Sequence, residues 1–175
     1  WGTFGSGSFA YRLGQEAFKQ RFDWLSNLKL RGGIGWVGNN NIGGFFPQLT
    51  LASGGADYNQ APGLALAQLG NPQLQWEQKR AIEGGLDLGV FNDRIFLTAT
   101  YYNEATTELI LNKQRPLNSG FGSVTQNAGE VVNQGVELQL ETQNFVGDFR
   151  WTTSINATFN DNEVKELVGG EPIIS

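Results

Sequence analysis

The sequence predicts an all-β fold: an antiparallel up-and-down β-barrel, present here as about six or seven strands that cross a membrane. Three observations support this. Apolar and polar side chains alternate with a period of two, the alternating segments are long, and short turns alternate with long links. The composition agrees, because 24 Gly, 12% aromatic residues and no Cys are typical of such barrels.

Two alternating segments lie near the start of the chain. A weak strand covers about residues 4–13, where Phe9, Tyr11 and Leu13 are in phase. The next strand has an apolar face and a basic one, formed by Leu28, Leu30, Ile34 and Trp36 against Lys29 and Arg31. Residues 15–27 between them are numerous enough for a short helix through Phe18 and Trp24.

Three further strands follow in the middle of the chain. Residues 82–90 place Ile82, Leu86, Leu88 and Val90 opposite Glu83 and Asp87. Residues 94–103 place Ile95, Leu97, Ala99 and Tyr101 opposite Phe96, Thr98, Thr100 and Tyr102. Residues 136–141 place Val136, Leu138 and Leu140 opposite Glu137, Gln139 and Glu141.

The clearest alternation runs over residues 148–160. Its odd positions are apolar with aromatics at both ends, whereas its even positions, which include Arg150 and Asn156, are polar. Globular strands usually span about 5–6 residues, whereas a tilted membrane strand needs about 9–11. The length favours a membrane strand over a soluble β-sandwich, which remains the alternative.

The connections predict two unlike ends of the sheet. Short turns at residues 91–94 and 144–148 join neighbouring strands, and Gly147 can adopt a positive φ. Long links cover residues 37–73 and 112–126, and a third begins near Asp161. The first link has room for a seventh strand at 45–51, and the third for a helical turn at 162–164. Outer-membrane barrels have short periplasmic turns and long extracellular loops.

Composition excludes several functions. Without Cys or His the segment cannot form a Cys/His zinc site, a thiol nucleophile or a Ser-His-Asp triad, so we expect no enzyme, cofactor or metal. A net charge of −5 with scattered basic residues argues against nucleic acid. Carboxylates four residues apart on a strand lie about 13 Å apart, too far for glycoside hydrolysis, which needs about 5–9.5 Å.

Several strings, read in order, resemble the C-terminal half of the barrel in the SusC/RagA family of TonB-dependent receptors. They are LSNLKLR at 25–31, GNN at 38–40, LGNPQLQWE at 69–77, GLDLGVFNDR at 85–94, YYN at 101–103, SGF at 119–121, NAG at 127–129, NQGVEL at 133–138 and FNDNEV at 159–164. The resemblance covers essentially the whole chain.

The resemblance implies a 22-stranded barrel of the bacterial outer membrane, of which residues 1–175 form a part. It also implies a plug domain and a TonB-contacting segment outside this chain, a SusD-like lipoprotein over the barrel mouth, and import of glycans or peptides. The alternatives are a passive porin, an adhesin-like barrel and, less favoured, a soluble carbohydrate-binding sandwich.

Site residues are predicted from the alternation and the loops. Lumen-facing polar residues are Lys29, Arg31, Glu83, Asp87, Glu137, Glu141, Arg150 and Asn156. Loop aromatics that could contact the substrate or the lid are Phe45, Phe46, Tyr58 and Phe121, and interfacial aromatics next to membrane lipid are Trp36, Phe149, Trp151 and Phe159.

Overall fold

The computed structural model describes residues 2–13, 22–41, 46–55, 57 and 61–167. Its elements are, in chain order, β1 (Ser6–Arg12), β2 (Leu25–Asn39), β3 (Leu51–Gly54), β4 (Leu64–Gln68), β5 (Glu77–Val90), β6 (Ile95–Thr107), β7 (Ile110–Gln114), the 3₁₀ turn η1 (Leu117–Ser119), β8 (Ser123–Asn127), β9 (Glu130–Val146) and β10 (Arg150–Glu166). No helix among these residues is long and apolar enough to cross a lipid bilayer.

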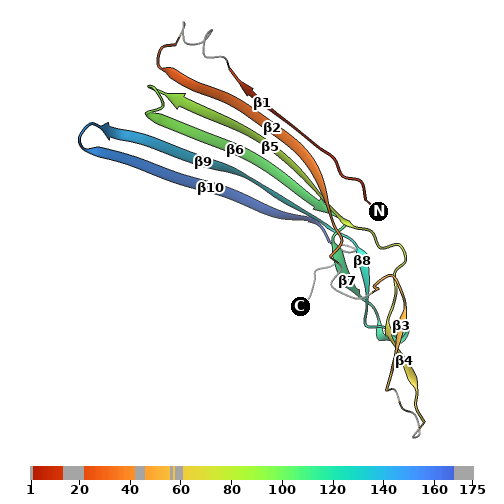
Figure 1. The fold of residues 1–175 in the computed structure, drawn as a ribbon. Helices are drawn as coiled ribbons and strands as arrows, with labels where there is room; N and C mark the ends of the chain where they lie inside the picture. The colour runs from red at the N-terminus through yellow and green to blue at the C-terminus, as the bar shows by residue number, and fades with distance from the viewer. Residues whose placement is uncertain (1, 14–21, 42–45, 56, 58–60, 168–175) are drawn as a thin grey trace.

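Six long strands form one antiparallel sheet in the order β1-β2-β5-β6-β9-β10 (Figure 1). These are the six strands that the alternation predicted. From β2 onward they have 13 to 17 residues, so each exceeds the length that a tilted membrane strand requires.

Short turns lie at one end of this sheet, as predicted. The turn between β5 and β6 has three successive residues with positive φ, namely Phe91, Asn92 and Asp93. Asn and Asp tolerate this left-handed conformation better than most residues. Figure 1 shows that the turn between β9 and β10 lies at the same end of the sheet.

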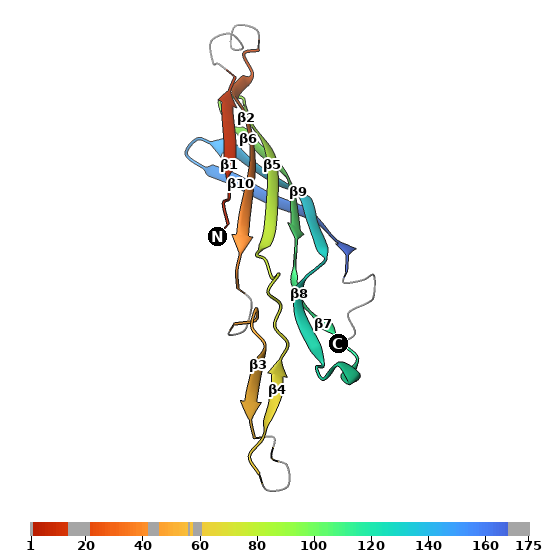
Figure 2. The same ribbon diagram turned by 90° about the vertical axis from the view of Figure 1, so that its right-hand side faces the viewer.

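Two smaller hairpins extend the sheet at its other end. β3 pairs with β4, and β7 pairs with β8, and both hairpins project beyond the long strands (Figures 1 and 2). They lie in the two long links, so each link contains an ordered hairpin, whereas the sequence suggested at most one strand in the first link and only loop in the second. The hairpins and the short turns are thus at opposite ends, as the connection lengths indicated.

Three local predictions fail or lie outside the described residues. Residues 46–50 form a turn and β3 begins only at Leu51, so the seventh strand is misplaced and Phe45 is not described. No helical turn occurs at 162–164, because β10 pairs with β9 as far as Glu166. The expected helix at 15–27 lies largely outside the described residues, and Trp24 sits in a turn before β2.

The sheet is a single layer with almost no interior of its own. Among the described residues, only Pro47, Gly89, Ala105 and Val124 are buried. Phe9 and Phe159 remain 66% and 65% exposed. Exposed apolar surface on this scale requires a covering phase or partner, and an open sheet cannot satisfy its edges alone.

Candidate functional site

One face of the sheet is aliphatic across its centre. The strand register aligns Leu28, Leu88, Leu97, Leu140 and Ile155 in one row from β2 to β10. The next row on the same face is Leu30, Leu86, Ala99, Leu138 and Ala157. This surface, called the apolar face below, results from the in-phase alternation of all these strands.

The opposite face is polar along the same strands. A row directly between the two aliphatic rows consists of Lys29, Asp87, Thr98, Gln139 and Asn156, and the row beyond it of Arg31, Gly85, Thr100, Glu137 and Thr158. The two-residue alternation also places Glu83, Glu141 and Arg150 on this side. All eight polar residues that the sequence singled out therefore share one surface, called the polar face below.

Charged groups of opposite sign meet on the polar face near β2 and β5. Asp87 lies 3.6 Å from the Lys29 ammonium and 3.6 Å from Nε of Arg31. Arg31 extends across Gly85 on β5 and donates a 2.5 Å hydrogen bond to Oγ1 of Thr100 on β6. A Cβ at Gly85 would lie 2.6 Å from the guanidinium carbon of Arg31, so the glycine leaves space for this crossing.

A second long side chain crosses a glycine in the same way. Tyr102 on β6 passes over Gly135 on β9 and its hydroxyl bonds to Oδ1 of Asn160 on β10 at 2.7 Å. A Cβ at Gly135 would lie 2.7 Å from that hydroxyl. Both crossings lay a long side chain flat along the sheet, so each links three neighbouring strands on the polar face.

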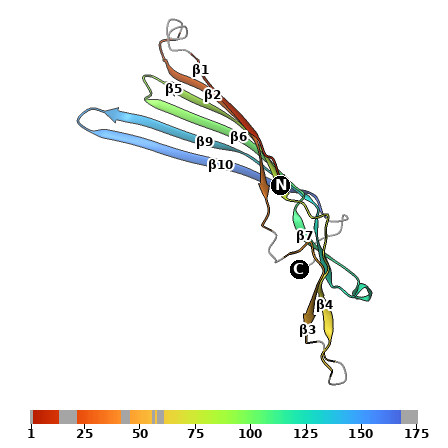
Figure 3. The same cartoon turned by 45° about the vertical axis from the view of Figure 1, so that its right-hand side comes forward.

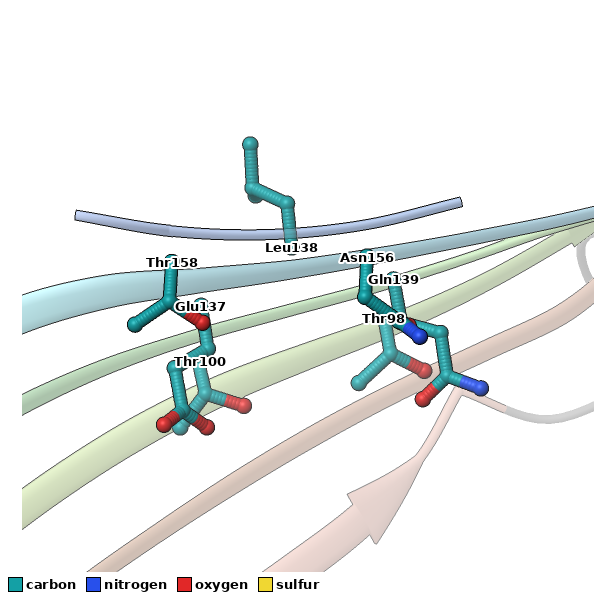
Figure 4. Close-up of a pocket in the computed structure, with 7 residues that line it drawn as sticks. All are labelled: Thr98, Thr100, Glu137, Leu138, Gln139, Asn156 and Thr158. Carbon is teal, nitrogen blue, oxygen red and sulfur yellow. The ribbon is translucent and has the colours of Figure 1, made fainter. Parts of the chain in front are cut away.

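A shallow hollow of about 230 Å³ lies next to these crossings, on β6, β9 and β10. Figure 4 shows its hydroxyl, amide and carboxylate groups on one side of the strands and Leu138 pointing to the other. The polar lining comes from three strands: Thr98, Thr100, Glu137, Gln139, Asn156 and Thr158. Such a surface offers hydrogen bonds to water or to polar solutes.

We expect Asp87→Asn to destabilise the complete protein by about 1 kcal/mol. The Asp87 side chain is only 15% exposed, and its neutralisation leaves Lys29 and Arg31 beside each other without a counter-charge. Denaturant unfolding in detergent measures the change. Glu83→Gln is the matched control on the same strand face, since Glu83 has no ion pair to another described residue, and an equal loss there would contradict the assignment.

Aromatic side chains gather at the short-turn end of the sheet. Phe145 lies 6.0 Å from Trp151 and 5.9 Å from Phe149, measured between ring centroids. The strand register shifts at Trp151/Thr152, so Asn144 is the extra residue of a bulge and is paired with no residue in the β9–β10 register. This bulge moves Phe145 out of phase with Glu141 and onto the side of Trp151, so the sequence alternation alone could not identify it.

The apolar face has a second group of aromatic side chains, at a different height along the strands and nearer the hairpin end. The two groups are called the aromatic levels below. Phe159 is 65% exposed there, in one row with Tyr101 and Phe9. The eight steps from Trp151 to Phe159 span about 27 Å along the strand, or about 22 Å at a tilt of about 35°. The next row on this side turns polar on β6, β9 and β10, where Asn103 and Asp161 both bond to Gln134, and remains apolar on β2 and β5 with Ile34 and Ile82.

Segment 69–77 joins the two projecting hairpins. Leu69 forms a parallel bridge with Val124, and the amide of Asn71 donates to the carbonyl oxygen of Thr125 at 3.1 Å. The carboxylate of Glu77 accepts from Nδ2 of Asn39 at 2.7 Å and from the backbone N–H of Ile110 at 2.9 Å. Hairpins that are distant in sequence are thus held together where they leave the sheet.

The predicted loop aromatics are only partly described. Phe46 is 61% exposed at the base of the β3–β4 hairpin, with φ at +53°. Phe121 is half-buried between η1 and β8. Phe45 and Tyr58 lie outside the described residues. Phe46 and Phe121 belong to different hairpins, and no ring contact joins them among the described residues.

The described residues form no cluster suited to binding a metal ion. They contain no group of three or more Asp or Glu placed to hold a metal ion. Asp161 and Glu163 belong to a paired strand with Asn162 between them pointing to the other face. The described residues thus form a single sheet with one apolar and one polar face, and two hairpins project from it.

Comparison with known proteins agrees with this geometry. The family model described as TonB dependent receptor-like, beta-barrel matches residues 1–174. The chain is 34% identical to the TonB-dependent receptor SusC of Bacteroides thetaiotaomicron over 98% of its length, and 34% identical to the TonB-dependent receptor P39 of Formosa agariphila over 95%. It spans only 18% and 16% of these relatives, respectively.

Solved structures give the same result. The RagAB peptide importer in the open-open state superimposes with a TM-score of 0.84 at 31% identity, covering 96% of this chain and 18% of that one. The RagAB peptide transporter gives 0.79 at 29% identity, covering 96% and 18%. The six described long strands do not close on themselves, as expected of one sector of a larger barrel. The chain therefore belongs to the TonB-dependent receptor family of the bacterial outer membrane and forms part of its β-barrel.

Proposed function

We propose that this chain forms part of the wall and the external loops of a receptor that imports glycans or peptides across the outer membrane with energy relayed by TonB. The contrast between the two faces of the sheet supports this most directly. A row of Leu and Ile lies beside a row of Lys, Asp, Thr, Gln and Asn over five strands. We infer that the apolar face meets lipid and that the polar face lines the lumen.

The aromatic levels fit the same orientation. Phe149 and Trp151 lie next to the short turn, whereas Phe159 lies toward the hairpins, so they would sit at the periplasmic and outer interfaces. Barrels place such girdles at both borders of an apolar band about 25 Å tall. Trp36 pairs with Arg80 one row beyond the polar transition, which suits the outer headgroup region.

The plug domain, the TonB-contacting segment and the remaining strands would lie elsewhere in the complete protein. In this arrangement the chain contributes no catalytic group, and it needs no cofactor or metal. Its projecting hairpins would contact a SusD-like lipoprotein that covers the barrel mouth. A passive porin or an adhesin would need neither the lid nor TonB.

Uptake by cells distinguishes the importer from a passive barrel. We expect the complete receptor, expressed with its lipoprotein, to accumulate labelled oligomers only when TonB is functional. Accumulation at an equal rate in cells lacking TonB would identify a passive pore and overturn the proposal. Surface binding without any uptake would identify an adhesin.

If the hairpins contact the lipoprotein lid, we expect one exposed loop residue, Phe46, to affect lid binding strongly. In the complete receptor Phe46→Ala should weaken lipoprotein binding by about tenfold or more, because exposed aromatics dominate interface energies. Binding of the purified lid to the receptor in nanodiscs measures this. Phe149→Ala, at the opposite end of the sheet, is the control and should leave lid affinity unchanged. Equal affinity for Phe46→Ala and the parent receptor would remove Phe46 from the interface.

A further inference from the structure

A hollow of about 490 Å³ opens where β5 and β6 continue into the projecting hairpins. Figure 3 shows the hairpins leaving the long strands in this region. Its lining consists only of amides and one carboxylate: Asn71, Gln73, Gln75, Glu108, Gln126 and Asn127. A ligand here would be recognised by hydrogen bonds, since no aliphatic, aromatic or basic side chain of the described residues lines the hollow.

The two asparagines of this hollow use their side chains to fix its backbone. Oδ1 of Asn127 accepts from the N–H of Gln75 at 2.7 Å, and its Nδ2 donates to the carbonyl oxygens of Gln75 at 2.8 Å and Glu108 at 2.9 Å. Asn71 accepts from the N–H of Gln73 at 3.1 Å. The segments that present the other four side chains are therefore pre-organised.

Those four side chains are available for a ligand. The side chains of Gln73, Gln75, Glu108 and Gln126 form no hydrogen bond or ion pair with another described residue, and the first three are exposed. Glu108 also has φ at +56°, a conformation that costs free energy for a residue with a side chain. The strain is held in place by the bond from Asn127 to its carbonyl.

We propose that this hollow is a binding subsite for a neutral saccharide, a proposal that rests on the import function above and specifies its ligand. Each Gln amide offers a donor and an acceptor, as do the hydroxyl groups that cover a sugar. The Glu108 carboxylate accepts from hydroxyls and repels anionic groups. A peptide would bring apolar side chains for which the lining has no counterpart, so peptide binding is disfavoured.

The test uses the complete receptor with its lipoprotein in detergent. It is screened against immobilised neutral oligosaccharides, uronic-acid oligosaccharides and peptides of matched length, and the tightest hit is titrated by calorimetry. We expect the hit to be neutral and its Kd to rise at least tenfold in the double variant Gln73→Ala with Gln126→Ala. Gln78→Ala is the matched control, since Gln78 is an exposed glutamine of β5 outside the hollow.

Two results would overturn this inference while leaving import intact: hits confined to peptides or acidic saccharides, or an unchanged Kd in the double variant. Glu108→Gln separates charge from hydrogen bonding. It should admit uronic-acid oligosaccharides that the parent receptor rejects, and continued rejection would argue against Glu108 as the discriminating group. A receptor that takes up no oligomer at all would overturn the proposed function together with this subsite.

Discussion

Ile155→Arg should destabilise membrane insertion of the complete receptor by about 2–4 kcal/mol, the cost of a charged side chain at the middle of the lipid-facing surface of a barrel. Ile155 is 55% exposed and ends an aliphatic row of five strands that includes Leu140, its partner on β9. It is four positions from Trp151 and four from Phe159, so it lies midway between the two aromatic levels.

The neighbouring residue is the control for this experiment. Asn156 lies in the adjacent polar row opposite Gln139. Asn156→Arg therefore places the same charge on the polar face, which we propose to line the lumen, and should change insertion by well under 1 kcal/mol. The ratio of folded to unfolded receptor in lipid vesicles over a urea titration gives both values. Equal losses at the two positions would mean that neither face of this sheet meets lipid.

The alternation of residues predicted the sheet well because lipid and water impose it on every strand. Leu86 and Asp87 are consecutive strand residues and therefore lie on opposite faces, whatever the register of the neighbouring strands. The face of each residue can thus be predicted from the sequence of β5 alone. The same holds for Thr153 to Asn160 on β10. The eight polar residues assigned to one surface share it for this reason, although their contact with the lumen remains a proposal.

The features that the sequence did not reveal depend on contacts between distant residues. Phe145 joins the aromatic level at the short turn only because a bulge forms opposite β10. The ordered hairpins in the long links are held by contacts such as Leu69 with Val124 and Asn71 with Thr125. No periodicity in either link signals a partner so far away, and the Asn and Gly content that suggested loops equally suits tight turns.

Gly135→Ala should lower the stability of the complete receptor by about 1–3 kcal/mol. An added Cβ would lie 2.4 Å from the carbonyl oxygen of Phe159 and 2.7 Å from the hydroxyl of Tyr102. The tyrosine could rotate away, at the cost of its bond to Asn160, but the backbone oxygen on β10 could move only by disturbing the β9–β10 pairing. The clash is therefore not relieved by a side-chain rotation.

Gly84→Ala and Tyr102→Phe make the Gly135 result interpretable. A Cβ at Gly84 meets nothing within 4 Å, so alanine there should be neutral or stabilise by up to about 1 kcal/mol through the unfolded chain. Tyr102→Phe removes only the hydrogen bond to Asn160, worth about 1 kcal/mol. Denaturant unfolding in detergent should rank Gly135→Ala as the largest loss of the three. If Tyr102→Phe loses as much stability as Gly135→Ala, the glycine serves only to let the tyrosine cross. If Gly84→Ala loses as much, any added methyl group in this wall is equally damaging, and close packing at Gly135 has no special role.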